Sequence, residues 1–358
     1  IQIDGNNFYA SCEQMIDPSL RGKGVVILSN NDGCIISRSA EVRRIGIPMG
    51  EPYFKLKAKL NQLNIEVRSS NYELYGDISN RLMNILKENC EELEVYSIDE
   101  AFACITRPKD QDLYPWAKQL RALVFQSIGI PISIGIGNSK VQSKAANHLA
   151  KTIEKHSGIF DIGIIQNTDK YLNLIEIEKV WGVGRKMSIW FRSKGITNAR
   201  ELRDMPREEI KYKWGIVGIR LQNELKGEIC IPLITKSSPR KQICVSRSFS
   251  YPISRLEELS LAISNYVLIA SSKLRKYNQL ASEINIFISS SNYSEITFRQ
   301  DATARLEIAS NDSETMLKES MQLTRKIFKP YQKLTKAGII MKNLQSDKYK
   351  QEVLFKSN

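Results

Sequence analysis

This sequence lacks long apolar runs, and its six cysteines and two histidines do not form clusters. No run approaches the roughly 18 apolar residues that a membrane-spanning helix needs, and no signal peptide is recognisable, so we expect a cytoplasmic protein without a membrane partner. The six cysteines include no Cys-x-x-Cys pair, and neither His148 nor His156 lies near a cysteine. This argues against a zinc site and a disulfide framework. The chain starts on Ile1 rather than methionine, and we expect it to lack its first residues.

Positive charge is distributed unevenly along the 358 residues, a length that suits about two to four domains. Residues 1–158 hold 19 Lys/Arg and 18 Asp/Glu, whereas residues 159–358 hold 33 and 21, so most of the net charge of +13 lies in the second part. Because Lys and Arg neutralise phosphates when a protein binds nucleic acid, this part predicts a nucleic-acid partner. Charge that serves only solubility is the alternative.

Three acidic residues lie at the ends of predicted strands. Asp4 ends the apolar start of the chain, and Asp99 and Glu100 close a Ser-Ile-Asp-Glu box that begins at residue 97. On neighbouring strands of one sheet these carboxylates would meet, and Mg²⁺ prefers such hard oxygen ligands. Adjacent residues point to opposite faces of a regular strand, so Asp99 and Glu100 share a metal only at a strand end or turn. A pair of Mg²⁺ ions held in this way would serve phosphoryl transfer. The alternative interpretation of the acid pair is an ordinary solvated turn.

Residues 1–158 have the pattern of a mixed α/β domain. Turn signals at 30–33 and 46–48 predict a small inserted subdomain between the first strand and residue 70. The expected strands are 1–4, 24–28, 93–98, 101–105 and 131–136, and the expected helices are 71–89, 113–128 and 139–153.

Residues 165–229 have a helical pattern without convincing strands, and they contain the hairpin sequence VWGVG at 180–184. It predicts a helix-hairpin-helix, in which Gly182 and Gly184 allow a tight turn whose N–H groups, with a helix N-terminus, bind a DNA phosphate. Basic neighbours, among them Arg185 and Lys186, favour this interpretation over an ordinary loop.

A basic, extended linker is expected over 230–242. After it the pattern predicts strands at 243–250, 281–290, 294–300 and 335–342 and helices at 255–277 and 312–330. This order is β-α-β-β-α-β, a ferredoxin-like unit. The alternation in 283–289 predicts a sheet with one face free to lie on a ligand.

Together these segments resemble the Y-family translesion DNA polymerases along nearly the whole chain. The motifs that carry the likeness are IDGNNFYASCE at 3–13, YSIDEAF at 96–102 and GIGNSK at 135–140. A narrower likeness, to the UmuC type of catalytic subunit in bacterial DNA polymerase V, comes from LSNNDGC at 28–34, SSNYELY at 69–75, VWGVGR at 180–185, SRSF at 246–249 and YQKLTKAG at 331–338.

The resemblance implies a right-hand polymerase of mixed α/β and α+β domains that performs error-prone translesion DNA synthesis in the bacterial DNA damage (SOS) response. The implied domains are a ferredoxin-like palm (1–9 and 70–158), small fingers (10–69), a helical thumb (159–229), the linker (230–242), a little finger (243–345) and a tail (346–358).

The resemblance also implies the metal and sugar sites. By motif position Asp4, Asp99 and Glu100, with the Gly5 carbonyl as a further ligand, are expected to hold two Mg²⁺ ions. Tyr9 matches the steric gate that excludes a ribose 2'-OH, with a packed core aromatic as the alternative. The neighbouring residue, Phe8, is expected in the core or near the nucleotide.

Arg43 and Lys151 match residues that bind the incoming triphosphate. The sequence departs from many relatives at Ala40, where they carry a tyrosine that contacts the phosphates, which leaves more of this task to Arg43 and to the helix with Lys151. Lys140, Lys144 and His148 share one face of that helix with Lys151. For Lys140 and Lys144 the choice between a ligand role and a solvated stripe stays open.

The end of the chain carries a candidate docking peptide, with Gln351, Leu354 and Phe355 in the Gln-x-x-Leu-Phe pattern by which bacterial polymerases bind the sliding clamp. The implied partners are primed template DNA, deoxynucleoside triphosphates, a UmuD-like processed dimer, RecA and the clamp. A nucleotide cyclase with a palm-like domain and a catalytically silent DNA-binding scaffold are the rival interpretations.

Overall fold

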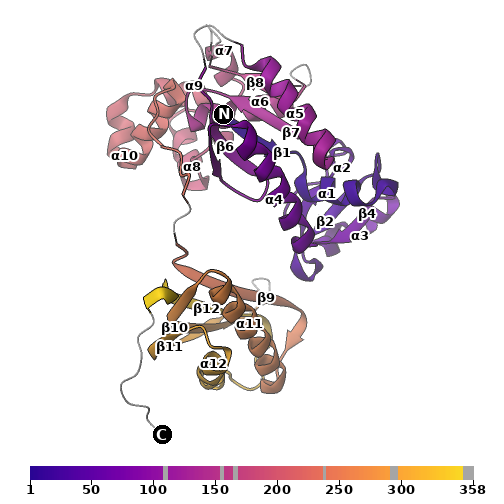
Figure 1. The fold of residues 1–358 in the computed structure, drawn as a ribbon, viewed down its shortest axis with the longest axis vertical. Coiled ribbons are helices and arrows are strands. Elements are labelled where there is room, and N and C mark those ends of the chain that lie inside the picture. Colours follow the sequence, from indigo (N-terminus) through magenta and orange to yellow (C-terminus); the bar gives the residue numbers. More distant parts are fainter. Residues whose placement is uncertain (108–111, 154–156, 164–167, 237–238, 291–296, 350–358) are drawn as a thin grey trace. The chain divides into compact units, whose positions relative to one another are not determined.

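The computed structural model describes residues 1–349 except 108–111, 154–156, 164–167, 237–238 and 291–296 (Figure 1). The chain forms two compact units, one from Ile1–Leu28 with Cys34–Ser237 and one from Ser29–Gly33 with Ser238–Asn358. None of the described helices is long and apolar enough to cross a membrane. Short 3-10 helices occur as η1 (Pro18–Leu20), η2 (Asn30–Asp32), η4 (Ile177–Lys179) and η5 (Asp347–Tyr349).

A five-stranded sheet with the order β5-β6-β1-β7-β8 organises the first unit. The central strand β1 is antiparallel to β6 and β7, and β8 is parallel to β7. The prediction for 93–98 runs too far, because the strand ends at Val95 before a turn, and β8 lies beyond residue 158, the predicted end of the palm. The strands are β1 (Gln2–Gly5), β5 (Glu92–Val95), β6 (Glu100–Cys104), β7 (Ile132–Ile136) and β8 (Ile159–Asp161).

Helices cover both faces of this sheet, and strand alternation decides which side chains meet them. Ile132, Ile134 and Ile136 of β7 pack with α1, α4 and α5, whereas Gly135 faces α6. A Cβ at Gly135 would come within 2.2 Å of the α6 backbone, so only glycine permits this approach. The helices predicted at 71–89, 113–128 and 139–153 are confirmed to within one residue at each end, whereas the helix at 8–16 was not predicted. Their bounds are α1 (Phe8–Ile16), α4 (Tyr72–Asn89), α5 (Tyr114–Ile128) and α6 (Lys140–Thr152).

The predicted inserted subdomain has its own small sheet and core. Strand β2 (Val25–Leu28) pairs in parallel with β4 (Glu66–Ser69) and antiparallel with β3 (Ile35–Arg38). Helices α2 (Ala40–Arg44) and α3 (Tyr53–Gln62) contribute Val42 and Leu60 to its core. Of the three strands, only the first was expected from the sequence.

Residues 168–229 are mainly helical, as predicted. Helices α7 (Asp169–Leu172), α8 (Arg185–Ser193), α9 (Ala199–Asp204) and α10 (Arg207–Lys226) surround an apolar cluster, and α10 is kinked at Gly215. The hairpin at 180–184 follows the short η4 rather than an α-helix, which corrects the first half of the predicted motif.

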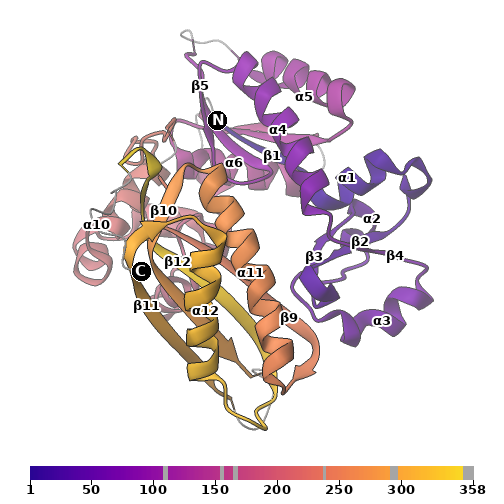
Figure 2. The same cartoon turned by 60° about the horizontal axis from the view of Figure 1, so that its bottom comes forward.

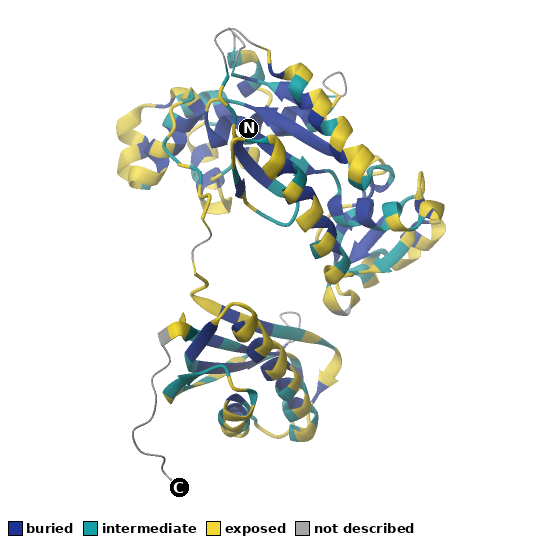
Figure 3. Cartoon of the chain, viewed as in Figure 1, coloured by how far each residue is buried: buried dark blue, intermediate teal, exposed yellow. Residues whose placement is uncertain are grey.

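The second unit has the predicted β-α-β-β-α-β order, and its sheet has the strand order β11-β10-β12-β9. Helices α11 (Leu256–Lys276) and α12 (Ser313–Ile327) lie together on one face of the sheet, as Figure 2 shows. Their buried residues form one core with those of the strands, and Figure 3 colours buried residues dark blue. The strands are β9 (Gln242–Ile253), β10 (Gln279–Ser289), β11 (Arg299–Ser310) and β12 (Leu334–Ser346).

The strand predicted at 294–300 is placed too early in its described part, because residues 297 and 298 are not in a strand and β11 runs from Arg299 to Ser310; residues 294–296 lie outside the described part of the chain. It is an edge strand in which Ala302, Ala304 and Leu306 face the core while charged and polar residues alternate with them. Two alanines between polar residues make a weak period-two signal, so the sequence pattern placed the strand too early.

Candidate active site

Strand pairing brings the predicted acids to one end of the first sheet. In the register of β1 with β6, Asp4 lies opposite Glu100. Asp99 lies in the turn just before β6, where its carbonyl accepts a hydrogen bond of 2.8 Å from the Gly5 N–H. The Ser97 hydroxyl closes this turn by donating to the Asp99 carboxylate at 2.7 Å and accepting from the Glu100 N–H at 3.1 Å. The expected position of the acid pair at a strand end is confirmed.

Two lysines of α6 neutralise two of these acids. Lys151 forms an ion pair with Asp4, and Lys144 contacts both carboxylate oxygens of Glu100 at 3.1 Å. Burial raises the pKa of Asp4 to about 6, with a further contribution from Glu100, although Lys151 opposes the shift. The negative charge at Asp4 is therefore incompletely compensated by the protein.

The oxygen donors at this end of the sheet are of the kind that a hard divalent cation prefers, because they are carboxylates beside a backbone carbonyl. Within the described parts of the chain, however, no three His, Cys, Asp or Glu side chains are arranged as a ready metal-binding group. In this structure Asp4 and Glu100 face lysines, and Asp99 faces Ser97. A metal would bind here in exchange for the lysine contacts.

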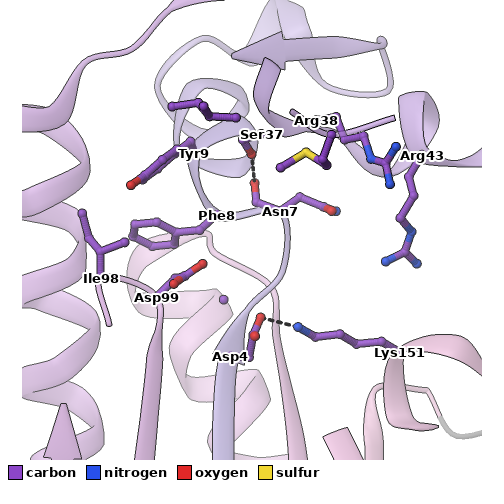
Figure 4. Close-up of a pocket in the computed structure, with 13 residues that line it drawn as sticks. Asp4, Asn7, Phe8, Tyr9, Ser37, Arg38, Arg43, Ile98, Asp99 and Lys151 are labelled. Atoms are coloured by element: carbon purple, nitrogen blue, oxygen red, sulfur yellow. Dashed lines mark hydrogen bonds and ion pairs between the residues drawn. The ribbon is translucent and has the colours of Figure 1, made fainter. Parts of the chain in front are cut away.

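A cavity of about 340 Å³ opens beside Asp4 and Asp99 and brings together most of the predicted site (Figure 4). The acids and Phe8 lie on one side of this view, and Arg38, Arg43 and Lys151 lie on the other. The residues that line it are Asp4, Gly5, Asn7, Phe8, Tyr9, Ile36, Ser37, Arg38, Arg43, Met49, Ile98, Asp99 and Lys151.

Aromatic neighbours hold Tyr9 at the edge of this cavity. Its ring stacks on that of Tyr75 with centroids 4.5 Å apart, and the edge of Tyr72 meets it at 5.9 Å. The Tyr75 hydroxyl in turn donates to Glu13 at 2.7 Å. Tyr9 thus packs against the core on one side and lines the cavity on the other. Phe8 is buried and also reaches the cavity lining.

Gly5 leaves room for the ring of Phe8. A Cβ at Gly5 would lie 2.9 Å from this ring, so a larger residue would force the buried ring to shift.

The three lysines on the shared face of α6 have different surroundings. Lys140 is 7% exposed and pairs with the equally buried Glu94 at 2.5 Å, so it is neither at the cavity nor solvated. Lys144 lies beside Glu100 and among the rings of Tyr96, Phe102 and Trp181 at 4.8 to 5.9 Å. Among these three lysines, only Lys151 lines the 340 Å³ cavity.

The hairpin at 180–184 lies next to the acids. Trp181 donates from its indole to the Tyr96 hydroxyl at 3.1 Å, and a second cavity of about 370 Å³ separates Gly182 from Glu100, Lys144 and His148. The hairpin needs glycine only at Gly182, which has a φ of 96°.

The start of α8 offers cations next to this hairpin. Gly184 is the N-cap of the helix, with an ordinary φ of −86°, and no neighbouring atom lies within 4 Å of a Cβ placed there. Arg185 and Lys186 are exposed in the first turn, whereas Arg192 is engaged by Glu178.

Sequence reasoning missed the part of the cavity that β3 supplies. Ile35 and Ser37 are buried on one face of this strand, which leaves Ile36 and Arg38 on the other. The alternation was present in the sequence, but the segment lay between two turn signals and was not assigned as a strand. The predicted docking residues Gln351, Leu354 and Phe355 lie outside the described residues.

Comparisons with known proteins agree with this geometry. The impB/mucB/samB family model matches residues 3–148, and the model of that family's C-terminal domain matches 240–354. Protein UmuC of Salmonella typhimurium is 36% identical over 359 residues, which cover 99% of this chain and 85% of that protein. Protein MucB of Escherichia coli is 33% identical, with 95% and 81% covered, and DNA polymerase IV 1 of Bacillus subtilis is 29% identical, with 82% and 71% covered.

Solved structures show the same fold. A Y-family DNA polymerase chimera of Dbh and Dpo4 superimposes with a TM-score of 0.77 at 18% identity, over 96% of this chain and 98% of the other. An insertion ternary complex of Dbh DNA polymerase gives 0.60 with the same identity and coverage. The resemblance seen in the motifs is confirmed, and the cyclase and silent-scaffold alternatives are not favoured. The chain therefore belongs to the impB/mucB/samB family and has the fold of the Y-family DNA polymerases.

Proposed function

We propose that this chain is a DNA-directed DNA polymerase for error-prone synthesis across damaged template in the bacterial SOS response. The observation that carries the proposal is the meeting of Asp4 and Asp99 with Tyr9, Arg43 and Lys151 around one cavity. A nucleotide polymerase needs acids for metals, cations for a triphosphate and a surface for the sugar. This cavity contains all three.

In the proposed reaction the primer 3'-hydroxyl loses its proton and attacks the α-phosphate of a deoxynucleoside triphosphate. The new phosphodiester bond forms as the bond to pyrophosphate breaks. Asp4, Asp99 and Glu100, with the Gly5 carbonyl, would hold two Mg²⁺ ions, which when bound lower the pKa of the hydroxyl and neutralise the leaving group.

The remaining residues of the cavity position the substrate. Arg43 and Lys151 neutralise the triphosphate, Lys151 by exchanging Asp4 for phosphate, and the ring of Tyr9 blocks a 2'-hydroxyl. Rate comes from positioning and charge neutralisation, with no covalent intermediate on the protein.

The DNA would be held mainly by basic surfaces outside this cavity. Gly182 and Gly184 present backbone N–H groups, and Arg185 and Lys186 add charge beside them, which suits a DNA phosphate. In the second unit, register places Lys336 and Arg299 on either side of Ser289, on the sheet face that α11 and α12 leave free. We assign the palm, fingers, thumb and little finger to the segments expected from the sequence, with β8 added to the palm.

The partners follow from the family rather than from a contact seen in the structure. We propose a UmuD-like processed dimer, RecA-dependent activation, and docking of Gln351, Leu354 and Phe355 on the sliding clamp, all in the cytoplasm.

Primer extension tests the polymerase proposal. With Mg²⁺ and a primed template, the wild-type chain, assayed alone and with its partner proteins, should add the complementary nucleotide. Asp99→Ala and Glu100→Ala should reduce the rate by about a hundredfold or more because the metal site is lost. DNA binding should survive in both variants.

The exposed Asp77, paired on the surface of α4 with Arg81, provides the matched control Asp77→Ala, which should extend normally. Template-independent addition, or full activity in both acid variants, would refute the proposed function.

A further inference from the structure

Arg38 ends β3 and directs its side chain toward the catalytic cavity. Ile36, Ser37 and Arg38 all line the cavity, but Ser37 is buried and its hydroxyl donates to the Asn7 carbonyl at 3.4 Å, so Arg38 supplies the charged group of this strand. Arg38 and Arg43 both line the cavity, and Figure 4 draws their guanidinium groups on the same side of it. Residues from β3 and α2 thus present two cations to one space.

Neither guanidinium has a partner in the part of the chain that the structure describes: no hydrogen bond, ion pair or ring contact engages the side chain of Arg38 or Arg43. The acids of the cavity are already committed, Asp4 to Lys151 and Asp99 to Ser97. Partly burying a cation without a counter-charge costs free energy, and a second cation beside it adds repulsion. Both effects lower the pKa of Arg38. A polyanion that enters the cavity would relieve both.

The chemistry of the two guanidinium groups indicates which class of anion they would bind. Guanidinium offers a planar fork of N–H donors that fits phosphate oxygens in pairs, and two adjacent forks suit a chain of phosphates better than a single small anion. Ala40, at the start of α2, has no polar side-chain atom to contribute. The phosphate contacts from this part of the fingers therefore depend on the arginines.

We propose that Arg38 binds the triphosphate of the incoming deoxynucleotide beside Arg43, as a second guanidinium of the phosphate site. This inference rests on the proposed polymerase function and adds a substrate-binding residue to it. Arg38 contacts substrate, so its loss weakens nucleotide binding, whereas DNA binding and the catalytic acids are unaffected.

Steady-state primer extension by the full chain tests the assignment. Arg38→Ala should raise the KM for the deoxynucleotide about tenfold, since a hydrogen-bonded charge contact is lost. Arg38→Lys, which keeps the charge but not the fork, should recover part of this loss. Arg44→Ala is the matched control, because Arg44 is the exposed neighbour of Arg43 on α2 and does not line the cavity.

Inhibition by inorganic tripolyphosphate separates phosphate recognition from contact with the base or sugar. The inhibition constant should rise in Arg38→Ala by a factor similar to that of KM. A higher KM with unchanged tripolyphosphate inhibition would assign Arg38 to the base or sugar and overturn the proposal. An unchanged KM would overturn it as well.

Two further measurements keep the outcomes distinct. The melting temperature of Arg38→Ala should equal or exceed that of the wild type, because an unpaired cation is removed; a lower melting temperature with weakened DNA binding would show a structural role and refute the proposal. If the wild-type chain extends no primer under any condition, the polymerase function fails first. In that case, unchanged binding of tripolyphosphate by Arg38→Ala would reject the arginine assignment independently.

Discussion

The lysines of helix α6 and the arginines of β3 and α2 differ in whether the protein itself neutralises them. On α6, Lys140, Lys144 and Lys151 each have an acidic partner, in Glu94, Glu100 and Asp4 respectively. On the fingers side, Arg38 and Arg43 have none among the described residues. Paired charges can be part of the stable fold, whereas a partly buried cation without a partner, such as Arg38, costs stability that a bound anion would offset.

The lysines also differ among themselves. Lys140 is buried with Glu94 and donates to the carbonyl of Pro232 at 2.8 Å, while the Ile234 N–H donates to Glu94 at 2.8 Å. This network attaches the start of the linker to the edge strand β5. Lys144 and Lys151 are more exposed and hold acids that a metal would claim. One helix face therefore carries a structural pair at one end and exchangeable pairs at the other.

The largest expected effect is on the buried pair. Glu94→Ala leaves Lys140 charged without a carboxylate partner, so the free energy of unfolding should fall by about 3 to 5 kcal/mol, measured by urea denaturation of the first unit. Glu92→Ala, an exposed acid of the same strand, is the control and should change it by less than about 0.5 kcal/mol. If Glu94→Ala were as stable as Arg38→Ala, the distinction between paired and unpaired cations would fail.

A smaller effect is expected at Tyr9, whose ring has one side packed in the protein and one side open to the cavity. Its ring is supported by Tyr75 on one side and borders the cavity on the other. Tyr9→Ala should raise ribonucleotide incorporation relative to deoxynucleotide by about tenfold or more, measured with single nucleotides in primer extension, because the steric block to the 2'-hydroxyl is removed. Tyr114→Ala, a half-exposed tyrosine on α5, is the control. Unchanged sugar selectivity would leave Tyr9 as a core aromatic.

The smallest effect is the response of stability to Mg²⁺ and pH. Burial and Glu100 raise the pKa of Asp4 to about 6, so Asp4 is mainly protonated in the folded protein at pH 5 and ionised at pH 7.5. Only the ionised carboxylate binds a cation well, and ligand binding stabilises the folded state. Mg²⁺ should therefore raise the melting temperature by about 2 °C or more at pH 7.5 and by less at pH 5.

Asp4→Asn is the control for this measurement, because it cannot ionise. In this variant the Mg²⁺ response should be small and independent of pH. An equal response of the wild type at both pH values would show that Asp4 does not control cation binding.

Much of the fold followed from local patterns. The amphipathic helices 72–89, 114–128 and 140–152 were predicted closely, because each has a long apolar period, and polar residues such as Asn71 and Ser139 cap two of them. Strand β3 was missed because it lies between two turn signals, and β4 (EVRS) and β8 (IFD) were missed because each contains at most two apolar residues. Edge strand β11 was misplaced because its inward residues include two alanines.

Some residues of the candidate site were predicted from the sequence and others were missed. Motifs supplied Asp4, Asp99 and Tyr9, and the match to the family supplied Arg43 and Lys151. The structure places all five around one cavity, and their roles remain predictions. Arg38 was missed because no motif contains it and its strand was not assigned.

The sequence by itself determined the family, the long helices and the set of acids, because motifs and apolar periods are local properties of a chain. Only the tertiary structure decided which charges are neutralised within the protein. Helical spacing placed Lys140, Lys144 and Lys151 on one face, but strands distant in sequence supplied their separate partners. The tertiary structure also brought Arg38 to the cavity, because strand pairing, and not spacing along the chain, decides which side chains line the same cavity.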